Sequence, residues 1–240
     1  MTKRKAPNRP WFLYSYKSTC LSYRGEPRRS GRTLDLVLAF FFGTVVQKLS
    51  AHHYLLVAGL FDLPRRDADL LGLAQEVADR ERDDVPWRET LDAVIDEIQH
   101  PAVPPEALAA EHARLFVLNS PRVPAQPYGS YWLEKDRRLM GDSSIEVRDL
   151  MARHGIRTDP EAGLLPDHLV AETEFLAWLM AEDDDTRSSR QALLEHLRAW
   201  TPHFTAALRN AEPLPRYRLA ADLLDRFIDW DSAPVQGQPH

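Results

Sequence analysis

The residues best suited to do chemistry in this chain lie between Leu115 and Phe175. A loop spaced by prolines carries tyrosine and tryptophan side chains, and a Pro-Asp-His triplet, Pro166 to His168, opens a helix-patterned segment further on. Aromatic side chains on such a loop have little entropy left to lose, and Tyr and Trp are favoured contact residues. The pattern favours a groove that grips a peptide, although the same aromatics could instead anchor a long loop to the core.

Two acidic residues near the end of this stretch are candidate site residues. Asp167 stands at the start of the expected helix, where free N–H groups and the helix dipole favour a negative charge. Glu172 follows His168 by four residues, so the two share a helix face and are expected to pair beside an apolar stripe. The pattern permits either a local cap with a satisfied pair or the polar floor of a groove.

Known catalytic and metal-binding motifs do not occur in the sequence. There is no Gly-rich phosphate loop and no Gly-x-Ser-x-Gly elbow. The histidines that could suggest a metal lack metal-ligand spacing and are expected to be structural: His52, His53, His196 and His203. The single cysteine, Cys20, excludes an internal disulfide framework and a cysteine-based metal cluster. We therefore expect no catalytic residue, no metal and no cofactor.

Length and charge narrow the classes of partner. A chain of 240 residues allows one large helical domain or two small ones, and can bury about 70% of its unfolded surface. The net charge of −6 argues against a nucleic-acid binder, which needs a basic face, and fits a partner with a basic segment. The charge is uneven, because residues 1–32 are basic and the remainder is acidic.

Residues 1–45 form an N-terminal extension of basic and then apolar character. The run Leu36–Val46 is too short for a bilayer span, which needs roughly 20 residues. Arg28-Arg29 before this run crudely resembles a twin-arginine export signal, but Ser30-Gly31-Arg32 and Asp35 argue against it. A buried first helix is favoured, and the residues before it are expected to be poorly ordered.

The extension also has an alternative explanation at the level of the gene. No methionine occurs between Met1 and Met140, so a non-AUG start near Val45 or Val46 would make these residues an artefact. The intact mass of the native protein would decide between the two starts.

From Gln47 onward the apolar residues recur with a helical period, and prolines fall at expected first turns. Asp142 and Ser143 are expected caps for one helix, which Gly155 closes. There is no repeat and no alternating strand of useful length. We expect an all-α, bundle-like domain of about ten helices over residues 46–230, followed by a loose tail, residues 231–240. The expected helices include 53–61, 67–82, 144–154, 166–180, 193–200, 204–208 and 216–230, with others opening at Pro86 and Pro104.

Several segments in combination resemble the TorD/DmsD family, cytoplasmic all-helical chaperones for molybdopterin oxidoreductases. The resemblance covers residues 53–224 and is best over 111–180. Its segments are Glu111–Phe116 (EHARLF), Pro127–Tyr131 (PYGSY), Leu139–Gly141, Glu146–Arg148 and Pro166–Phe175 (PDHLVAETEF). The chain departs from the family at Thr173, where an apolar residue is usual, at residues 117–121, where a Gly-Pro turn is frequent, and in its basic extension.

The resemblance implies binding rather than catalysis. Family members bind the twin-arginine signal peptide, and sometimes the body, of a molybdoenzyme precursor, which blocks premature export until the cofactor is inserted. The implied binding positions are Tyr128, Ser130, Trp132, Gly141, Pro166, Asp167 and His168, with Glu172 and Phe175 on the matching helix. A basic pair followed by an apolar run also calls for an apolar groove with acidic groups at one end. Trp132, Leu139 and Phe175 could line it, and Asp167, Glu172 and Glu134 could supply the acid.

Two other functions remain open at this stage. One is an assembly chaperone of the nitrate-reductase type, which grips a catalytic subunit that is not exported. The other is a metal-dependent hydrolase, although Asp167-His168 reverses the order of the usual His-Asp pair. The expected partner is a molybdopterin oxidoreductase subunit, with no nucleic acid and no stable membrane insertion. The expected location is the cytoplasm, as a monomer or as a domain-swapped dimer.

Overall fold

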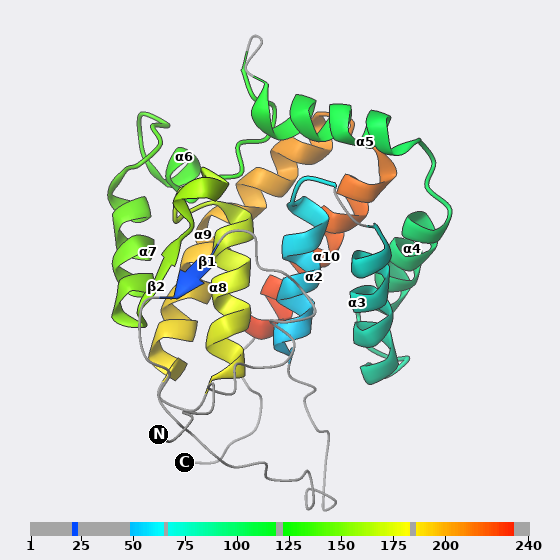
Figure 1. Ribbon diagram of the computed structural model, residues 1–240, viewed down its shortest axis with the longest axis horizontal. Helices are drawn as coiled ribbons and strands as arrows, with labels where there is room; N and C mark the ends of the chain where they lie inside the picture. Colours follow the sequence, from blue (N-terminus) through cyan, green and yellow to red (C-terminus); the bar gives the residue numbers. More distant parts are fainter. Residues whose placement is uncertain (1–20, 24–48, 65–66, 119–121, 183–185, 233–240) are drawn as a thin grey trace, which may run out of the picture.

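Two helices that are apolar on nearly every side form the centre of the structure. They are α2 (Ala51–Phe61) and α8 (Leu169–Ala181), and they pack against each other along their length. A helix without a polar face is stable only when it is buried all round. The computed structural model describes residues 21–23, 49–64, 67–118, 122–182 and 186–232, and Figure 1 shows α2 and α8 side by side in its middle.

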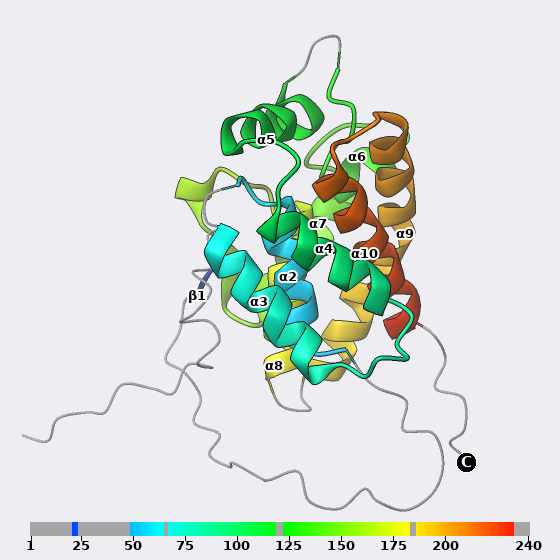
Figure 2. The same cartoon turned by 90° about the vertical axis from the view of Figure 1, so that its right-hand side faces the viewer.

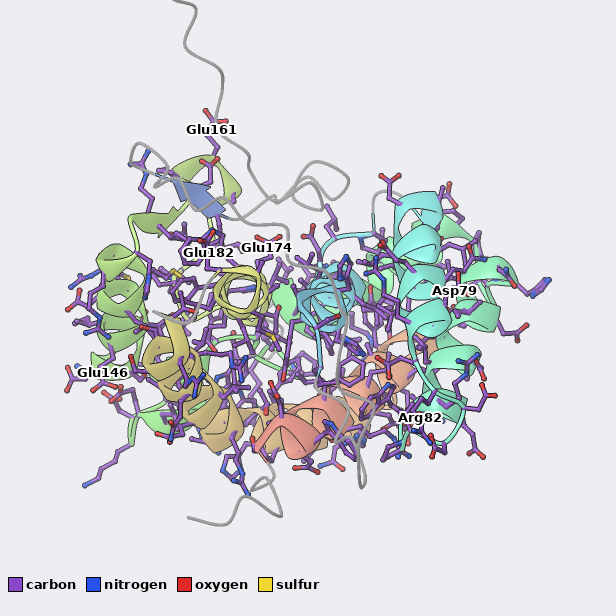
Figure 3. The ribbon with its side chains drawn as sticks, turned by 90° about the horizontal axis from the view of Figure 1, so that it is seen from below. Asp79, Arg82, Glu146, Glu161, Glu174 and Glu182 are labelled. Carbon is purple, nitrogen blue, oxygen red and sulfur yellow. The ribbon has the colours of Figure 1, made fainter. Side chains whose placement is uncertain are left out.

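Amphipathic helices cover this central pair from both sides. On one flank are α3 (Asp67–Arg80), α4 (Arg88–Gln99) and α10 (Pro215–Ser232); on the other are α7 (Asp142–Arg153) and α9 (Arg187–Asn210), with α9 packed on α8 and α10. Figure 3, seen from below, shows α2 and α8 between the two flanks, with the labelled Glu146 on the α7 side and Asp79 on the α3 side.

Shorter helices close the upper end of the bundle. Helix α5 (Pro105–His112) starts with Pro105 in its first turn and continues into a π-helical turn, η1 (Ala113–Val117). Figures 1 and 2 both show α5 lying across the top of the molecule. Helix α6 (Gly129–Leu133) and the 3₁₀ turn η2 (Pro160–Ala162) precede and follow α7. None of the described helices combines the length and the apolar character that crossing a bilayer requires.

The chain also forms a short antiparallel pair of strands, which we did not expect. Strand β1 (Leu21–Tyr23) pairs with β2 (Ile156–Thr158), with Leu21 opposite Thr158 and Tyr23 opposite Ile156. Strands of three residues are too short for an alternating pattern to be visible in a sequence. The rest of the extension lies outside the described residues, including Arg28-Arg29, the expected helix over 36–46 and the alternative start at Val45 or Val46.

The all-α prediction is confirmed, but several helix boundaries differ from the predicted ones, most clearly at α9 and α10. We expected separate helices over 193–200 and 204–208, whereas α9 is continuous through Pro202. A proline inside a helix removes one hydrogen bond. The buried side chains of Trp200 and Phe204 on either side of it hold the helix together. Helix α10 extends to Ser232, so residues 231 and 232 of the expected tail are helical; residues 233–240 lie outside the described residues.

Two helix starts were also predicted imprecisely. Gly141 is the N-cap of α7, so Asp142 and Ser143 lie within its first turn instead of preceding it. Helix α8 begins at Leu169 with His168 as its N-cap, three residues after the predicted start at Pro166. Gly155 follows the end of α7 with a positive φ of 71°, as a closing glycine should.

Candidate functional site

Asp167 joins three elements at the point where α6, α7 and α8 meet. Its side chain is wholly buried, the backbone N–H of Ser130 donates to Oδ2 (2.8 Å), and the hydroxyl of Ser144 donates to Oδ1 (2.6 Å). We expected this carboxylate to serve the start of α8, the helix that follows it. It instead accepts from the first turn of α6, because the chain before α8 runs alongside that helix.

Backbone pairing fixes this arrangement. Tyr128 and His168 form an isolated antiparallel bridge, in which Gly129 N donates to Asp167 O (2.9 Å) and Leu169 N donates to Pro127 O (2.8 Å). The rings of Tyr128 and His168 meet edge to face, with centroids 4.9 Å apart. The Tyr-Gly-Ser-Tyr and Pro-Asp-His segments, almost 40 positions apart in the sequence, therefore form one unit.

His168 is the N-cap of α8 through its ring. The Nδ1 atom accepts a hydrogen bond from the backbone N–H of Val170 (3.2 Å). Burial lowers the pKa of His168 to about 3, against a smaller opposing effect of Asp167. The ring is therefore neutral at physiological pH, and because Nδ1 is the acceptor the proton resides on Nε2.

Glu172 does not pair with His168, contrary to our expectation. Its Oε1 lies 3.0 Å from Nε2 of His196, and the indole N–H of Trp200 donates to Oε2 (3.2 Å). Burial raises the pKa of Glu172, against the opposing effects of His196 and Trp200. Burial alone would lower the pKa of His196, but Glu172, with smaller contributions from Asp167 and Glu146, outweighs this effect and the pKa is raised. The predicted pairing of Glu172 with His168 was wrong because the actual partners, His196 and Trp200, both lie in α9. Spacing along the chain cannot reveal contacts between two helices.

Gly129 brings α6 directly onto this pair. A Cβ atom at this position would lie 2.9 Å from Nε2 of His196 and 3.1 Å from Nε1 of Trp200, closer than side chains normally approach. The first residue of α6 must therefore be a glycine for the helix to sit at this depth. We did not single out Gly129, His196 or Trp200 from the sequence as site residues.

Glu134 and Gly141, two further predicted residues, lie in the segment between α6 and α7. Oε1 of Glu134, which ends α6, accepts from the backbone N–H of Ser143 (3.2 Å) and from its hydroxyl (3.1 Å). A side chain at Gly141 would collide with the Glu134 carboxylate. Pro166 is half-buried just before Asp167. These contacts hold the segment to the start of α7.

The outer face of α6 and the segment after it carry aromatic and apolar side chains. Trp132 is half-buried, and its indole N–H donates to the carbonyl of Gln126 (2.8 Å). Beside it lies a cavity of about 470 Å³ lined by Trp132, Glu134, Lys135, Arg137, His203, Ala206, Ala207 and Asn210. The exposed apolar side chains in this region are Leu133, Leu139, Met140 and Ile145.

The predicted site residues thus divide into a buried frame and a surface. Tyr128, Trp132 and Leu139 have side chains that are half-buried or exposed. Phe175 belongs to the core, where its ring is wholly buried beside Trp178. The frame consists of Ser130, Asp167, His168 and Glu172, each with less than a tenth of its surface exposed. The frame can hold α6 rigidly in position, and the surface can present aromatic and apolar groups to a ligand.

Comparison with known proteins gives a consistent result. Residues 80–206, more than half of the chain, match the model of the family described as nitrate reductase delta subunit. The chain is 31% identical over 118 residues to the Tat proofreading chaperone DmsD of Salmonella typhi, covering 49% of this chain and 57% of that protein. It is 29% identical over 162 residues to chaperone protein TorD of Psychrobacter sp. (strain PRwf-1), covering 63% and 73% respectively.

The chain therefore spans less than two thirds of the DmsD protein that it matches. Among solved structures, it is similar to a protein of Archaeoglobus fulgidus proposed to be a redox enzyme maturation protein. The TM-score is 0.55 at 24% identity, over 80% of this chain and 98% of the other. At this level of identity, the similarity shows that the two proteins share a fold.

Proposed function

Because this chain belongs to the nitrate reductase delta subunit family, we propose that it is a chaperone for a molybdopterin oxidoreductase subunit. In this proposal it binds the subunit's twin-arginine signal peptide, its body or both in the cytoplasm, before export, while the cofactor is inserted. The names of the relatives support a chaperone rather than an enzyme. Because the chain matches only part of the length of these relatives, the client and the mode of binding are part of the proposal.

The observation that carries this function is an aromatic and apolar surface mounted on a buried, hydrogen-bonded frame. Trp132 in α6 is half-buried and Leu139 in the segment after it is exposed, whereas Asp167 and Glu172 are wholly buried. Peptide-binding surfaces of this kind gain affinity when the contact residues are already held in place. The apolar run of a signal peptide would lie against Leu133, Leu139 and Met140, which are exposed.

Each residue of the predicted site has a place in this mechanism. Tyr128, Trp132 and Leu139 contact the peptide, while Gly141 and Pro166 shape the segments beside them. Phe175 supports the region from the core. Ser130, Asp167, His168 and Glu172 position α6. Asp167 and Glu172 are buried and already paired, so they act by positioning rather than by meeting the client's basic residues.

The proposal is tested by capture of the client from the native lysate with tagged protein, followed by mass spectrometry. We expect an uncleaved molybdopterin oxidoreductase subunit, lost when its twin arginines are changed to lysines. Trp132→Ala should weaken binding by about tenfold or more, because a central aromatic contact is typically worth that much. Trp132→Phe, which keeps a ring, should retain most of the affinity. If no such subunit is captured by the wild-type protein, the chaperone function is wrong.

The same experiment separates the second candidate, an assembly chaperone for a subunit that is not exported. This alternative is kept because the matched family is described as nitrate reductase delta subunit. Capture of the subunit regardless of its signal sequence would identify the body of the enzyme as the target. A hydrolase is the weakest candidate, because both oxygens of Asp167 and the Nδ1 atom of His168 are engaged in the fold.

A further inference from the structure

A positively charged side chain of the protein itself covers the aromatic pair of α6. The guanidinium carbon of Arg137 lies 5.6 Å from the ring centroid of Tyr131 and 5.9 Å from that of Trp132. The two rings meet edge to face, with centroids 5.0 Å apart. A guanidinium within about 6 Å of an aromatic ring is attracted by the negative charge of the ring face. Arg137 therefore makes a cation–π contact with both rings at once.

The backbone that delivers Arg137 to this place is strained. Arg137 has a φ of 52°, and Met140 in the same segment has a φ of 60°. Side chains other than glycine rarely adopt this left-handed region, and such conformations persist only where the surrounding structure holds them. A turn in which Arg137 N donates to Glu134 O (3.1 Å) fixes the residue. Arg137 thus combines a left-handed backbone conformation with contacts to two aromatic rings.

Two of the three acidic groups expected to meet a basic ligand do not reach this surface, and the third is partly engaged in the fold. Asp167 and Glu172 are wholly buried and paired, and Oε1 of Glu134 accepts from Ser143. The faces of Tyr131 and Trp132 are half-buried, and the 470 Å³ cavity opens beside Trp132. The ring faces of Tyr131 and Trp132 offer an attractive surface to a ligand that carries an arginine, and Arg137 already contacts both rings.

We propose that Tyr131 and Trp132 form a binding subsite for an arginine side chain of the client peptide, with Arg137 as the internal occupant that this arginine displaces. This inference rests on the proposed function. An incoming guanidinium replaces one of the same chemistry, so recognition needs no buried acid. Displacement also releases the segment after α6, which carries the exposed side chains of Leu139 and Met140.

The test compares Arg137→Ala with Arg138→Ala, its charge-matched neighbour. Arg138 is exposed, and its ion pair with Asp136 is a surface contact of 3.7 Å. Both variants lose one positive charge, but only Arg137→Ala vacates the ring faces. The ligands are two synthetic peptides with the same apolar run, one preceded by Arg-Arg and one by Ala-Ala. Affinity is measured by titration calorimetry, and the total tryptophan fluorescence is followed in parallel.

We expect Arg137→Ala to bind the Arg-Arg peptide about three- to tenfold more tightly than the wild type, because an internal competitor of cation–π strength is lost. Arg138→Ala should bind it with unchanged affinity, and Arg137→Lys should stay close to the wild type. The Ala-Ala peptide should show no gain with any variant.

The failures of the inference and of the proposed function are distinguishable. If the wild type binds the Arg-Arg peptide and Arg137→Ala binds it equally or more weakly, the displacement is wrong while the peptide-binding function stands. A gain of similar size for Arg138→Ala would reduce the effect to net charge and would also overturn the subsite. If no variant binds either peptide, both the subsite and the binding of a signal peptide are wrong.

Discussion

At the scale of single residues, the most consequential group is the carboxylate of Asp167. It is wholly buried and accepts from the backbone N–H of Ser130 and from the hydroxyl of Ser144. A buried donor that loses its acceptor costs its full desolvation energy. Asp167→Ala leaves two such donors, so we expect a loss of about 3 kcal/mol in the free energy of unfolding, measured by denaturant titration. Peptide affinity should fall as well, because α6 loses its anchor.

A second aspartate provides the control for this change. The side chain of Asp159 accepts from the backbone N–H of Glu161 at the start of η2, in an exposed position. Asp159→Ala should cost about 1 kcal/mol or less and leave peptide binding unchanged, because it removes one solvent-accessible cap. Equal stability of the Asp167→Ala and Asp159→Ala variants would contradict the anchoring role of Asp167.

At the scale of secondary-structure elements, the site depends on the depth at which α6 sits on α9. In Gly129→Ala the new methyl group would press on His196 and Trp200, whose rings are held by Glu172. Overpacking of this kind costs about 1–3 kcal/mol, against a gain of about 1 kcal/mol from helix propensity. We expect a net loss of stability and a shift of α6 that weakens peptide binding. Denaturant titration measures the free energy of unfolding of the variant, and titration calorimetry measures its affinity for the peptide.

Gly72→Ala makes the same substitution in α3 without the steric conflict. No heavy atom lies within 4 Å of where its Cβ would stand, so helix propensity alone decides the outcome. We expect this variant to gain about 0.5–1 kcal/mol and to bind the peptide as the wild type does. If Gly129→Ala behaved like Gly72→Ala, the close approach of α6 to α9 would not limit the site.

The elements also show which features a sequence reveals. The helices α2 and α8 are apolar on nearly every side and α3 carries a regular stripe, so local pattern predicts them. The pairing of β1 with β2, the continuity of α9 through Pro202 and the contact of Glu172 with His196 depend on residues far apart in the chain or on packing. Asp167 and Glu172 were named from the sequence, but their hydrogen-bond partners could be identified only in the fold.

At the scale of the whole molecule, the contact between Glu172 and His196 links the central helix α8 to α9, so it affects global stability. The pKa of His196 is raised in the folded protein, where the attraction of Glu172, Asp167 and Glu146 together outweighs the opposing effect of burial. A group with a raised pKa binds its proton more tightly when folded, so its contribution is complete below the unfolded value of about 6.5. The contribution is lost as the pH rises through the folded pKa.

We therefore expect the free energy of unfolding to decrease as the pH rises above about 6.5, the unfolded pKa of histidine. In His196→Gln the amide can still donate to Glu172 but cannot titrate, so this part of the decrease should disappear. Denaturant titrations of both proteins across this range measure the difference. Parallel pH profiles would mean that Glu172 and His196 do not form an ion pair in the folded protein. The frame beneath α6 would then be held by neutral hydrogen bonds, and peptide binding would not weaken through this pair at alkaline pH.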